Sequence, residues 1–245
     1  MPAPDFIGVG AQRSGTTWWF RSLLTHPQIR SASGRTKETH FFDRFGAWEL
    51  RAEDIAGYHE LFRRKRGQVA GEWTPRYMSD VWTPRLLCRA APEAKILVLL
   101  RDPVERYRSG LVHRLTRAPE RRREMLAADA IERGRYASQL ERLRRCFAPE
   151  RMLVLQYERC REEPAEQYRR TLRFLGVEED HAVDFERPRG TTTEAKKDPM
   201  WPELRDALRT TLRPEVAALA ALVPDLDLSL WPNFADLAPA DAPAA

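Results

Sequence analysis

Cysteine is scarce in this sequence of 245 residues, which contains only Cys88, Cys146 and Cys160. Their odd number and wide spacing exclude a disulfide framework and give no zinc-binding pattern. Long apolar runs are also missing, so the sequence predicts no membrane span. The first residues contain neither a basic leader nor an extended apolar region. This excludes a typical secretory signal and predicts a cytoplasmic protein.

Low-complexity linkers and internal repeats are absent as well, so nothing in the sequence divides the chain. We therefore expect one domain over residues 1–245, with a core at about 6–232 and a frayed tail at 235–245. Hydrophobic residues make up 42% of the sequence and charged residues 31%. This composition is typical of a globular protein rather than a disordered one.

Lysine is rare among the 41 basic residues, because all of them except Lys37, Lys65, Lys95, Lys196 and Lys197 are arginine. Arginine suits the bidentate capture of phosphate, sulfate or carboxylate, although a compositional bias of the source genome explains the excess equally well. The formal net charge is +5. Acidic residues are interspersed with the basic ones and no nucleic-acid-binding motif is present, so we expect no nucleic-acid partner.

One stretch, residues 6–20, carries the clearest functional signal. It opens with a short apolar segment that predicts a buried strand, continues as the loop Gly10-Ala-Gln-Arg-Ser-Gly15, and then becomes helical. In such a strand–loop–helix unit, backbone N–H groups and the positive end of the helix dipole converge on one point. The sequence therefore predicts a phosphate or sulfate site, with a β–α turn that binds nothing as the simpler alternative.

The two glycines have the spacing of a nucleotide-binding P-loop, but Thr16 stands where such a loop carries its lysine. That lysine acts on the β- and γ-phosphates of a nucleoside triphosphate, and the hydroxyl after it binds magnesium. Its absence disfavours a P-loop kinase or NTPase, which stays the main rival enzyme class beside a non-catalytic binder of anionic nucleotides. The one cation inside the loop is Arg13.

Apolar runs at 95–100 and 152–156 predict two strands that are buried on both faces, as in a parallel α/β sheet. A weaker pattern at 68–77 predicts a short strand and a turn. The first helix is expected to turn Trp18, Phe20 and Leu24 toward the core. Helical patterns occur at 17–25, 52–64, 84–91, from Pro103 onward, at 113–147, 164–175 and 202–222. We therefore expect an α/β fold, a single domain with a central, mainly parallel sheet flanked by helices.

Arg101 directly follows the strand at 95–100, and ligands of open parallel sheets bind at the carboxyl ends of the strands. Ser109 lies two turns along the helix that Pro103 opens. We expect Arg101 and Ser109 at the ligand edge. A structural ion pair of Arg101 with Asp102 or Glu105 is the alternative.

A second polar cluster places Lys37, Glu38 and His40 beside a pair of phenylalanines. Titratable groups mixed with apolar ones are unusual in an ordinary solvated loop and point to a functional site. A surface ion pair of Lys37 with Glu38 is the alternative explanation.

Together these stretches resemble the sulfotransferases that use 3'-phosphoadenosine 5'-phosphosulfate (PAPS), which have a P-loop NTPase-like fold. The similarity is to the heparan sulfate O- and N-sulfotransferases and their bacterial relatives, and it covers roughly residues 6–232. The matching stretches are Gln12–Thr17, Lys37–Asp43, Leu99–Arg106 with Ser109, Gln156–Glu158 and Phe174–Gly176. The first and the third of these together form the strongest signal.

The resemblance implies a PAPS-dependent sulfotransferase that transfers a sulfuryl group to a hydroxyl, or with less support an amine, of a small molecule or saccharide. It assigns the 3'-phosphate to Arg101 and Ser109, which would select PAPS over ATP. In-line displacement depends mainly on positioning and charge stabilisation, so no metal is required. The loop residues that would bind the 5'-phosphosulfate are Gln12, Arg13, Ser14, Gly15, Thr16, Thr17 and Trp18, and Arg13 would also stabilise the leaving phosphate.

The resemblance also supplies a base for the acceptor hydroxyl, because the glutamate of the matching Lys-Glu-x-His-Phe-Phe stretch corresponds to Glu38. His40 competes for this role, since an unperturbed histidine titrates near neutrality. The segment that covers the cofactor in the family would be either Arg189-Gly190 or Lys196-Lys197.

Two positions depart from the family pattern. Arg13 stands where the family loop usually has lysine, and Trp73 stands where heparan-type members have lysine in Glu-Lys-Thr-Pro. Arg76 or Lys37 would have to supply the missing cation. We expect Lys37, Trp73 and Arg76 to contact the acceptor, with Trp73 stacking on a sugar or an aromatic ring.

Overall fold

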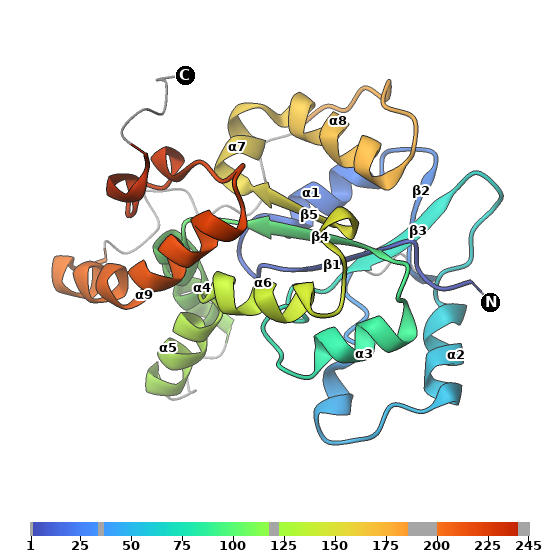
Figure 1. Cartoon of the computed structure of the whole chain (residues 1–245), viewed down its shortest axis with the longest axis horizontal. Helices are drawn as coiled ribbons and strands as arrows, with labels where there is room; N and C mark the ends of the chain where they lie inside the picture. Colours follow the sequence, from blue (N-terminus) through green and yellow to red (C-terminus); the bar gives the residue numbers. More distant parts are fainter. Residues whose placement is uncertain (1, 34–36, 118–122, 186–199, 240–245) are drawn as a thin grey trace.

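The computed structural model describes residues 2–33, 37–117, 123–185 and 200–239. Its centre is a five-stranded sheet with the order β2-β3-β1-β4-β5, in which every pair of neighbouring strands is parallel. The strands are β1 (Phe6–Gly10), β2 (Ile29–Ser31), β3 (Val69–Trp73), β4 (Lys95–Leu100) and β5 (Met152–Gln156). The expected α/β fold with a central parallel sheet is confirmed, and Figure 1 shows helices on both sides of the sheet.

Alternation along β4 shows how the sheet is buried. Ile96, Val98 and Leu100 belong to one hydrophobic cluster, whereas Leu97 and Leu99 belong to the other. Successive side chains of a strand point to opposite faces, so an unbroken apolar run fills both layers. The sheet is therefore the middle layer of a three-layer α/β/α arrangement.

Two helical layers cover the sheet (Figure 1). On one face lie α1 (Thr16–Leu23), α7 (Tyr157–Glu162) and α8 (Pro164–Leu175). The other cluster takes buried residues from α2 (Ala52–Glu60), α3 (Thr83–Ala90), α4 (Pro103–Arg117), α5 (Arg123–Glu132), α6 (Tyr136–Arg144) and α9 (Pro202–Leu222). Helix α8 ends at Gly176, which adopts φ 79° and closes the last turn.

The first helix differs in detail from the expectation. Trp19, Phe20 and Leu23 are its buried apolar residues, whereas Trp18 and Leu24 are only half-buried. Among the described strands and α-helices, β2 and α7 were not predicted. β2 is a three-residue edge strand with one buried residue, Ile29, so it leaves almost no periodic signal.

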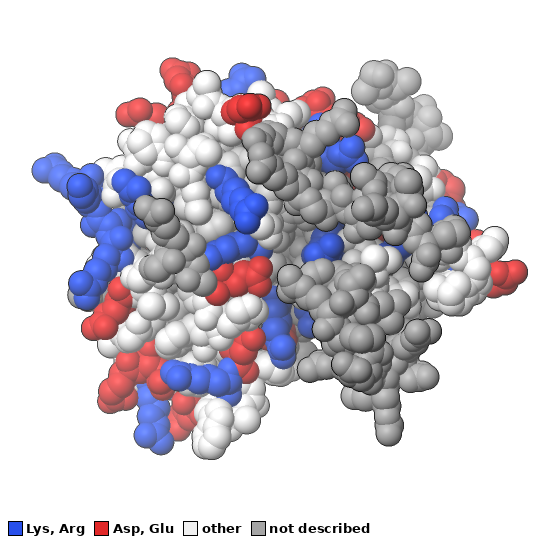
Figure 2. Space-filling model, turned by 180° about the vertical axis from the view of Figure 1, so that it is seen from behind, with Lys and Arg blue, Asp and Glu red and all other residues white. Residues whose placement is uncertain are grey.

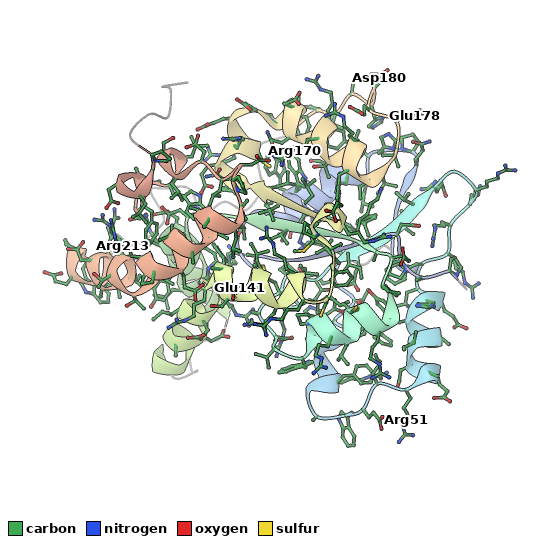
Figure 3. All side chains as sticks on the ribbon, in the orientation of Figure 1. Arg51, Glu141, Arg170, Glu178, Asp180 and Arg213 are labelled. Carbon is green, nitrogen blue, oxygen red and sulfur yellow. The ribbon has the colours of Figure 1, made fainter. Side chains whose placement is uncertain are left out.

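The expected frayed tail is wrong for residues 235–239. Ala235–Leu237 form a short 3-10 helix, and Trp231 and Phe234 just before it are buried. Asp236 pairs with Arg213 of α9 at 2.5 Å. Figure 3 shows Arg213 on α9, the helix against which this C-terminal segment lies. The ordered core therefore extends past residue 232, since these contacts bury apolar surface beyond it.

None of the helices in the described ranges is long and apolar enough to cross a membrane. The three cysteines are free thiols, half-buried at Cys88 and Cys146 and buried at Cys160. On the face drawn in Figure 2, the described lysines and arginines are interspersed with acidic residues.

Candidate active site

The loop between β1 and α1 has the conformation that its glycines predict. Gly15 is the N-cap of α1 with φ 84°, a left-handed conformation that side chains rarely adopt. A Cβ atom at this position would lie 2.6 Å from the ring of Tyr157. Gly15 is therefore required twice, once by the backbone and once by the neighbouring ring.

The start of α1 is available for an anion. Its first helical hydrogen bond runs from Trp19 N–H to the Gly15 carbonyl at 3.1 Å, so the amides of Thr16, Thr17 and Trp18 precede the intrahelical pattern. The first turn contains no acidic residue. The buried hydroxyl of Ser14 lies within hydrogen-bond reach of the Tyr136 hydroxyl. Unpaired donors at the positive end of a helix dipole are the chemistry of a phosphate or sulfate site.

The structure brings Arg13, Arg101 and Ser109 together. The Arg13 Nε donates to Ser109 Oγ at 3.3 Å, and Arg101 Nη1 lies 3.5 Å from the Arg13 carbonyl. The Arg101 guanidinium stacks over the Tyr157 ring at 5.0 Å and is 3.9 Å from Glu105. The loop after β1 and the turn after β4 are therefore joined by contacts of these arginine side chains.

The turn that carries Arg101 is fixed from behind by buried acids. Asp102 N–H donates to Glu158 Oε1 at 3.1 Å, and the Trp231 indole donates to Glu158 Oε2 at 2.9 Å. The Asn233 amides, backbone and side chain, both donate to Asp102 Oδ2. Burial raises the pKa of Asp102, and it raises the pKa of Glu158 to about 7. The C-terminal segment is thus tied to the turn after β4.

The second polar cluster forms a chain of charges beside the loop. Lys37 Nζ contacts Glu38 Oε1 at 2.7 Å and Thr16 Oγ1 at 3.1 Å. His40 places Nε2 3.2 Å from Glu38 Oε2 and Nδ1 3.0 Å from Asp43. Both oxygens of Glu38 are therefore held by cationic or N–H groups, and the cluster is joined to α1 through Thr16.

Glu72 is a supporting residue that the sequence reasoning missed. Its buried carboxylate accepts hydrogen bonds from Thr39 N–H and Oγ1 at 3.1 and 2.8 Å, from Tyr58 at 2.7 Å and from Thr74 at 2.5 Å. Burial raises its pKa. A lone acid inside a strand pattern was the available signal, because a buried carboxylate must be hydrogen-bonded. Glu72 anchors the segment that holds Glu38 and His40.

Trp73 does not have the acceptor-stacking position expected from the sequence. It is fully buried, and its indole N–H donates to the Gly10 carbonyl at 3.1 Å. The missing side chain of Gly8 on the adjacent strand makes the room, since a Cβ there would lie 2.1 Å from the indole. The ring is part of the core and has no face to offer a sugar.

The remaining candidates are distributed as follows. Arg76 is 42% exposed and binds Asp80 at 3.1 Å, with Asp43 at 3.8 Å, so it borders the Glu38 cluster. Gln12 and Trp18 are half-buried and Thr17 is exposed. Arg189, Gly190, Lys196 and Lys197 lie outside the described residues. No cluster of three or more metal-ligating side chains occurs within the described parts of the chain.

Comparisons with known proteins identify the family of the chain. The sequence profile of the sulfotransferase domain family matches residues 3–202. Heparan sulfate glucosamine 3-O-sulfotransferase 3B1 of Mus musculus is 31% identical over 188 residues, which is 71% of this chain and 46% of that protein. Bifunctional heparan sulfate N-deacetylase/N-sulfotransferase 3 of Homo sapiens is 28% identical, and the match covers 71% of this chain but 22% of that protein. The chain thus spans less than half the length of these two relatives.

Solved structures give the same answer for the fold. A sulfotransferase from Alicyclobacillus acidocaldarius superposes with a TM-score of 0.76 at 29% identity, covering 94% of this chain and 99% of that one. A sulfotransferase from Mycobacterium avium shares the fold at a TM-score of 0.54 and 16% identity. With the family profile matched over most of its length, the chain belongs to the sulfotransferase family.

Proposed function

We propose that the chain transfers a sulfuryl group from PAPS to a hydroxyl of a saccharide or small-molecule acceptor, with Glu38 as the general base. The observation that carries this proposal is the meeting of three elements at the start of α1. The Arg13–Ser109 contact joins the loop after β1 to helix α4. Lys37, in the segment that follows β2, contacts both Glu38 and Thr16. The two proposed anion sites and the Glu38 carboxylate would therefore lie around the start of α1.

The residues present fit PAPS. The first amides of α1, the Arg13 side chain and the neighbouring Ser14 would hold the 5'-phosphosulfate. Arg101 and Ser109 would hold the 3'-phosphate, with Arg101 oriented by the Tyr157 ring. When bound, PAPS supplies the sulfuryl group. Arg13 and the loop amides would stabilise negative charge on the 5'-phosphate, which in-line displacement requires.

Glu38 fits the role of base better than His40 does. Each ring nitrogen of His40 already contacts a carboxylate, Glu38 on one side and Asp43 on the other, so neither nitrogen is left facing an acceptor hydroxyl. A carboxylate has about four acceptor positions and can take a proton while it keeps both of its contacts. His40 and Lys37 would then orient Glu38 toward the acceptor hydroxyl.

The acceptor class is proposed from the relatives and from the exposed rim of the site. Two of them are named for glucosamine of heparan sulfate and for N-sulfotransfer, so both hydroxyl and amine acceptors occur among them. Arg76, half-exposed beside the Glu38 cluster, would contact the acceptor. A screen of hydroxyl and amine acceptors with labelled PAPS would identify it.

Calorimetry separates the proposal from its rivals. Adenosine 3',5'-bisphosphate should bind tightly without magnesium, and ATP should bind much more weakly. ATP binding that equals or exceeds bisphosphate binding would favour a P-loop kinase or NTPase. Tight bisphosphate binding with no turnover on any acceptor would favour a non-catalytic nucleotide binder.

The base assignment has its own test. Glu38→Gln should lower kcat by about 10²–10⁴-fold while bisphosphate affinity stays the same. Glu60→Gln, the same change at an exposed position of α2, is the matched control and should keep wild-type turnover. Near-normal turnover of Glu38→Gln would remove Glu38 from this role.

A cytoplasmic location and metal independence also belong to this proposal. Cell fractionation tests the location. Metal independence is tested by dialysis against EDTA, which should leave the activity unchanged, because arginine and lysine would stabilise the negative charge on the 5'-phosphate.

A further inference from the structure

Lys37 takes up a position that the sequence pattern of the loop leaves without a cation. Thr16 stands where a nucleotide-binding P-loop carries its lysine. The structure nevertheless places an ammonium at this residue, since Lys37 Nζ lies 3.1 Å from Thr16 Oγ1. A lysine 21 positions further along the chain therefore brings its charge to the place where the loop itself has a hydroxyl.

The local electrostatics are unfavourable for a cation in the free protein. The Lys37 side chain is only 16% exposed, and it lies over the positive end of the α1 dipole. Burial lowers its pKa, Arg21 lowers it further, and Glu38 opposes both effects. An anion at the start of α1 would compensate the remaining positive charge, so this arrangement is suited to a protein that binds one there.

The main chain fixes this side chain from two directions. The Lys37 carbonyl accepts the Trp73 N–H at 2.8 Å, which sets the segment on the end of β3. Two residues later, Thr39 donates twice to the buried Glu72. The ammonium is consequently held by the sheet rather than by a freely moving loop, and small positional errors at such a site are costly in rate.

We propose that Lys37 is a catalytic cation that contacts the 5'-phosphosulfate, rather than an acceptor-binding residue. This inference rests on the proposed sulfuryl transfer. In that step Glu38 takes the acceptor proton as the acceptor oxygen bonds to sulfur. The bond from sulfur to the 5'-phosphate oxygen breaks, and its electron pair stays on the phosphate. Lys37 stabilises this charge together with Arg13, and its contact with Glu38 sets the base beside the reacting atoms.

Paired ligands test the assignment by binding alone. Lys37→Met keeps the length of the side chain and removes the charge. It should weaken adenosine 3',5'-bisphosphate by about 10-fold and leave adenosine 3'-monophosphate, which lacks the 5'-phosphate, within about 2-fold. Lys65→Met, the same change at an exposed lysine, should alter neither. Thermal unfolding of each variant shows that the compared proteins are folded.

The outcomes separate this inference from the proposed function. If the wild type fails to bind the bisphosphate, sulfuryl transfer itself is wrong. If the wild type binds it and Lys37→Met weakens both ligands equally, or neither, the catalytic role of Lys37 is wrong. A variant that only raises the KM of the acceptor, with unchanged bisphosphate affinity, would return Lys37 to the acceptor side.

Amine labelling gives a readout that needs neither activity nor a substitution. With a small amine-reactive reagent and peptide mass analysis, the bisphosphate should slow labelling of Lys37 several-fold, whereas the 3'-monophosphate should not. Lys65 should label at one rate throughout. Equal protection of Lys37 by both ligands would overturn the contact with the 5'-phosphate.

The catalytic part of the inference is tested by turnover. Lys37→Met should lose about 100-fold in kcat, and Lys37→Arg should recover part of that loss.

Discussion

Helices α1 and α4 begin in the same way, after neighbouring strands of one parallel sheet, yet their first turns differ. The N-cap of α1 is Gly15, which has no side chain, and its first turn contains no acid. In α4 the Asp102 carboxylate accepts the amides of Val104 and Glu105 at 2.9 and 3.2 Å. The first amides of α1 therefore have no side-chain acceptor, whereas those of α4 are bound by Asp102.

If both helix starts serve the proposed anion sites, the difference implies that one fold unit would do so in two ways. At α1, backbone amides would bind the ligand, so side chains there must stay out of the way. At α4 the amides are already satisfied, so the proposed binding would fall to side chains, Arg101 beside the turn and Ser109 two turns on. The first proposed site would depend on backbone shape and the second on charge.

The strongest way to break the comparison is to add an acid to the first turn of α1. Thr17→Asp places an acid in the exposed first turn of α1. It should weaken adenosine 3',5'-bisphosphate by about 100-fold, because like charges repel at the amides, while the helix dipole keeps stability equal or slightly higher. Calorimetry and thermal unfolding measure the two effects.

Thr17→Asn is the matched control, since it has nearly the same shape without the charge. It should bind the bisphosphate within a few-fold of the wild type. Unchanged affinity in Thr17→Asp would show that the start of α1 is not the 5' site.

The next largest effect concerns the side-chain site. Arg101→Ala should weaken the bisphosphate by about 30-fold, since hydrogen bonds to charged groups are strong, and should change the binding of adenosine 5'-phosphosulfate by less than about 3-fold. Arg161→Ala is the control, because Arg161 lies over the same Tyr157 ring at 5.9 Å and is exposed. Equal losses for both ligands in Arg101→Ala would contradict the 3'-phosphate role.

A smaller effect is expected on stability. Asp102→Ala removes the cap of α4 and leaves the Asn233 amides without their acceptor, so it should cost about 2 kcal/mol of unfolding free energy. Urea unfolding measures this. No comparable loss should follow from Thr17→Asn, because the first amides of α1 have no side-chain cap to lose. A stability unchanged in Asp102→Ala would show that α4 does not depend on this carboxylate.

The smallest effect is a dependence of stability on pH that arises at the turn preceding α4. The pKa of Glu158 is about 7 in the folded protein, above its ordinary value of 4.5. The folded state therefore binds this proton more tightly, and the stability gained is complete below about pH 4.5 and lost as the pH rises through 7. Relative to Glu158→Gln, wild-type stability should fall as the pH rises from 5 to 8, which urea unfolding at each pH measures. Parallel curves for the two proteins would remove Glu158 as the source.

Strong local signals made most of the fold predictable. The bounds of β4, β5, α8 and α9 agree with the sequence patterns, because unbroken apolar runs and glycine or proline boundaries leave few alternatives. The convergence of Arg13, Arg101 and Ser109 was predictable too, since the ends of adjacent parallel strands meet at one edge.

The remaining features depend on contacts between distant residues. Trp73 looks like a surface ring in sequence, and only the pairing of β3 with β1 reveals the space that Gly8 leaves for it. Glu72 likewise accepts two of its hydrogen bonds from Thr39, a residue 33 positions earlier. The short helix α7 directly follows β5. Its six residues are too few to show a helical periodicity in the sequence.

The bond between Asp102 and Asn233 has a consequence for synthesis of the protein. The two residues are 131 positions apart. At the pace of translation, roughly 10 s pass between their emergence. The Arg13–Ser109 contact can form once residue 109 has emerged, but the turn that carries Arg101 receives the contacts from Trp231 and Asn233 only after residue 233 has emerged. The nascent chain can therefore join the loop after β1 to α4 well before the turn between β4 and α4 is fixed from behind.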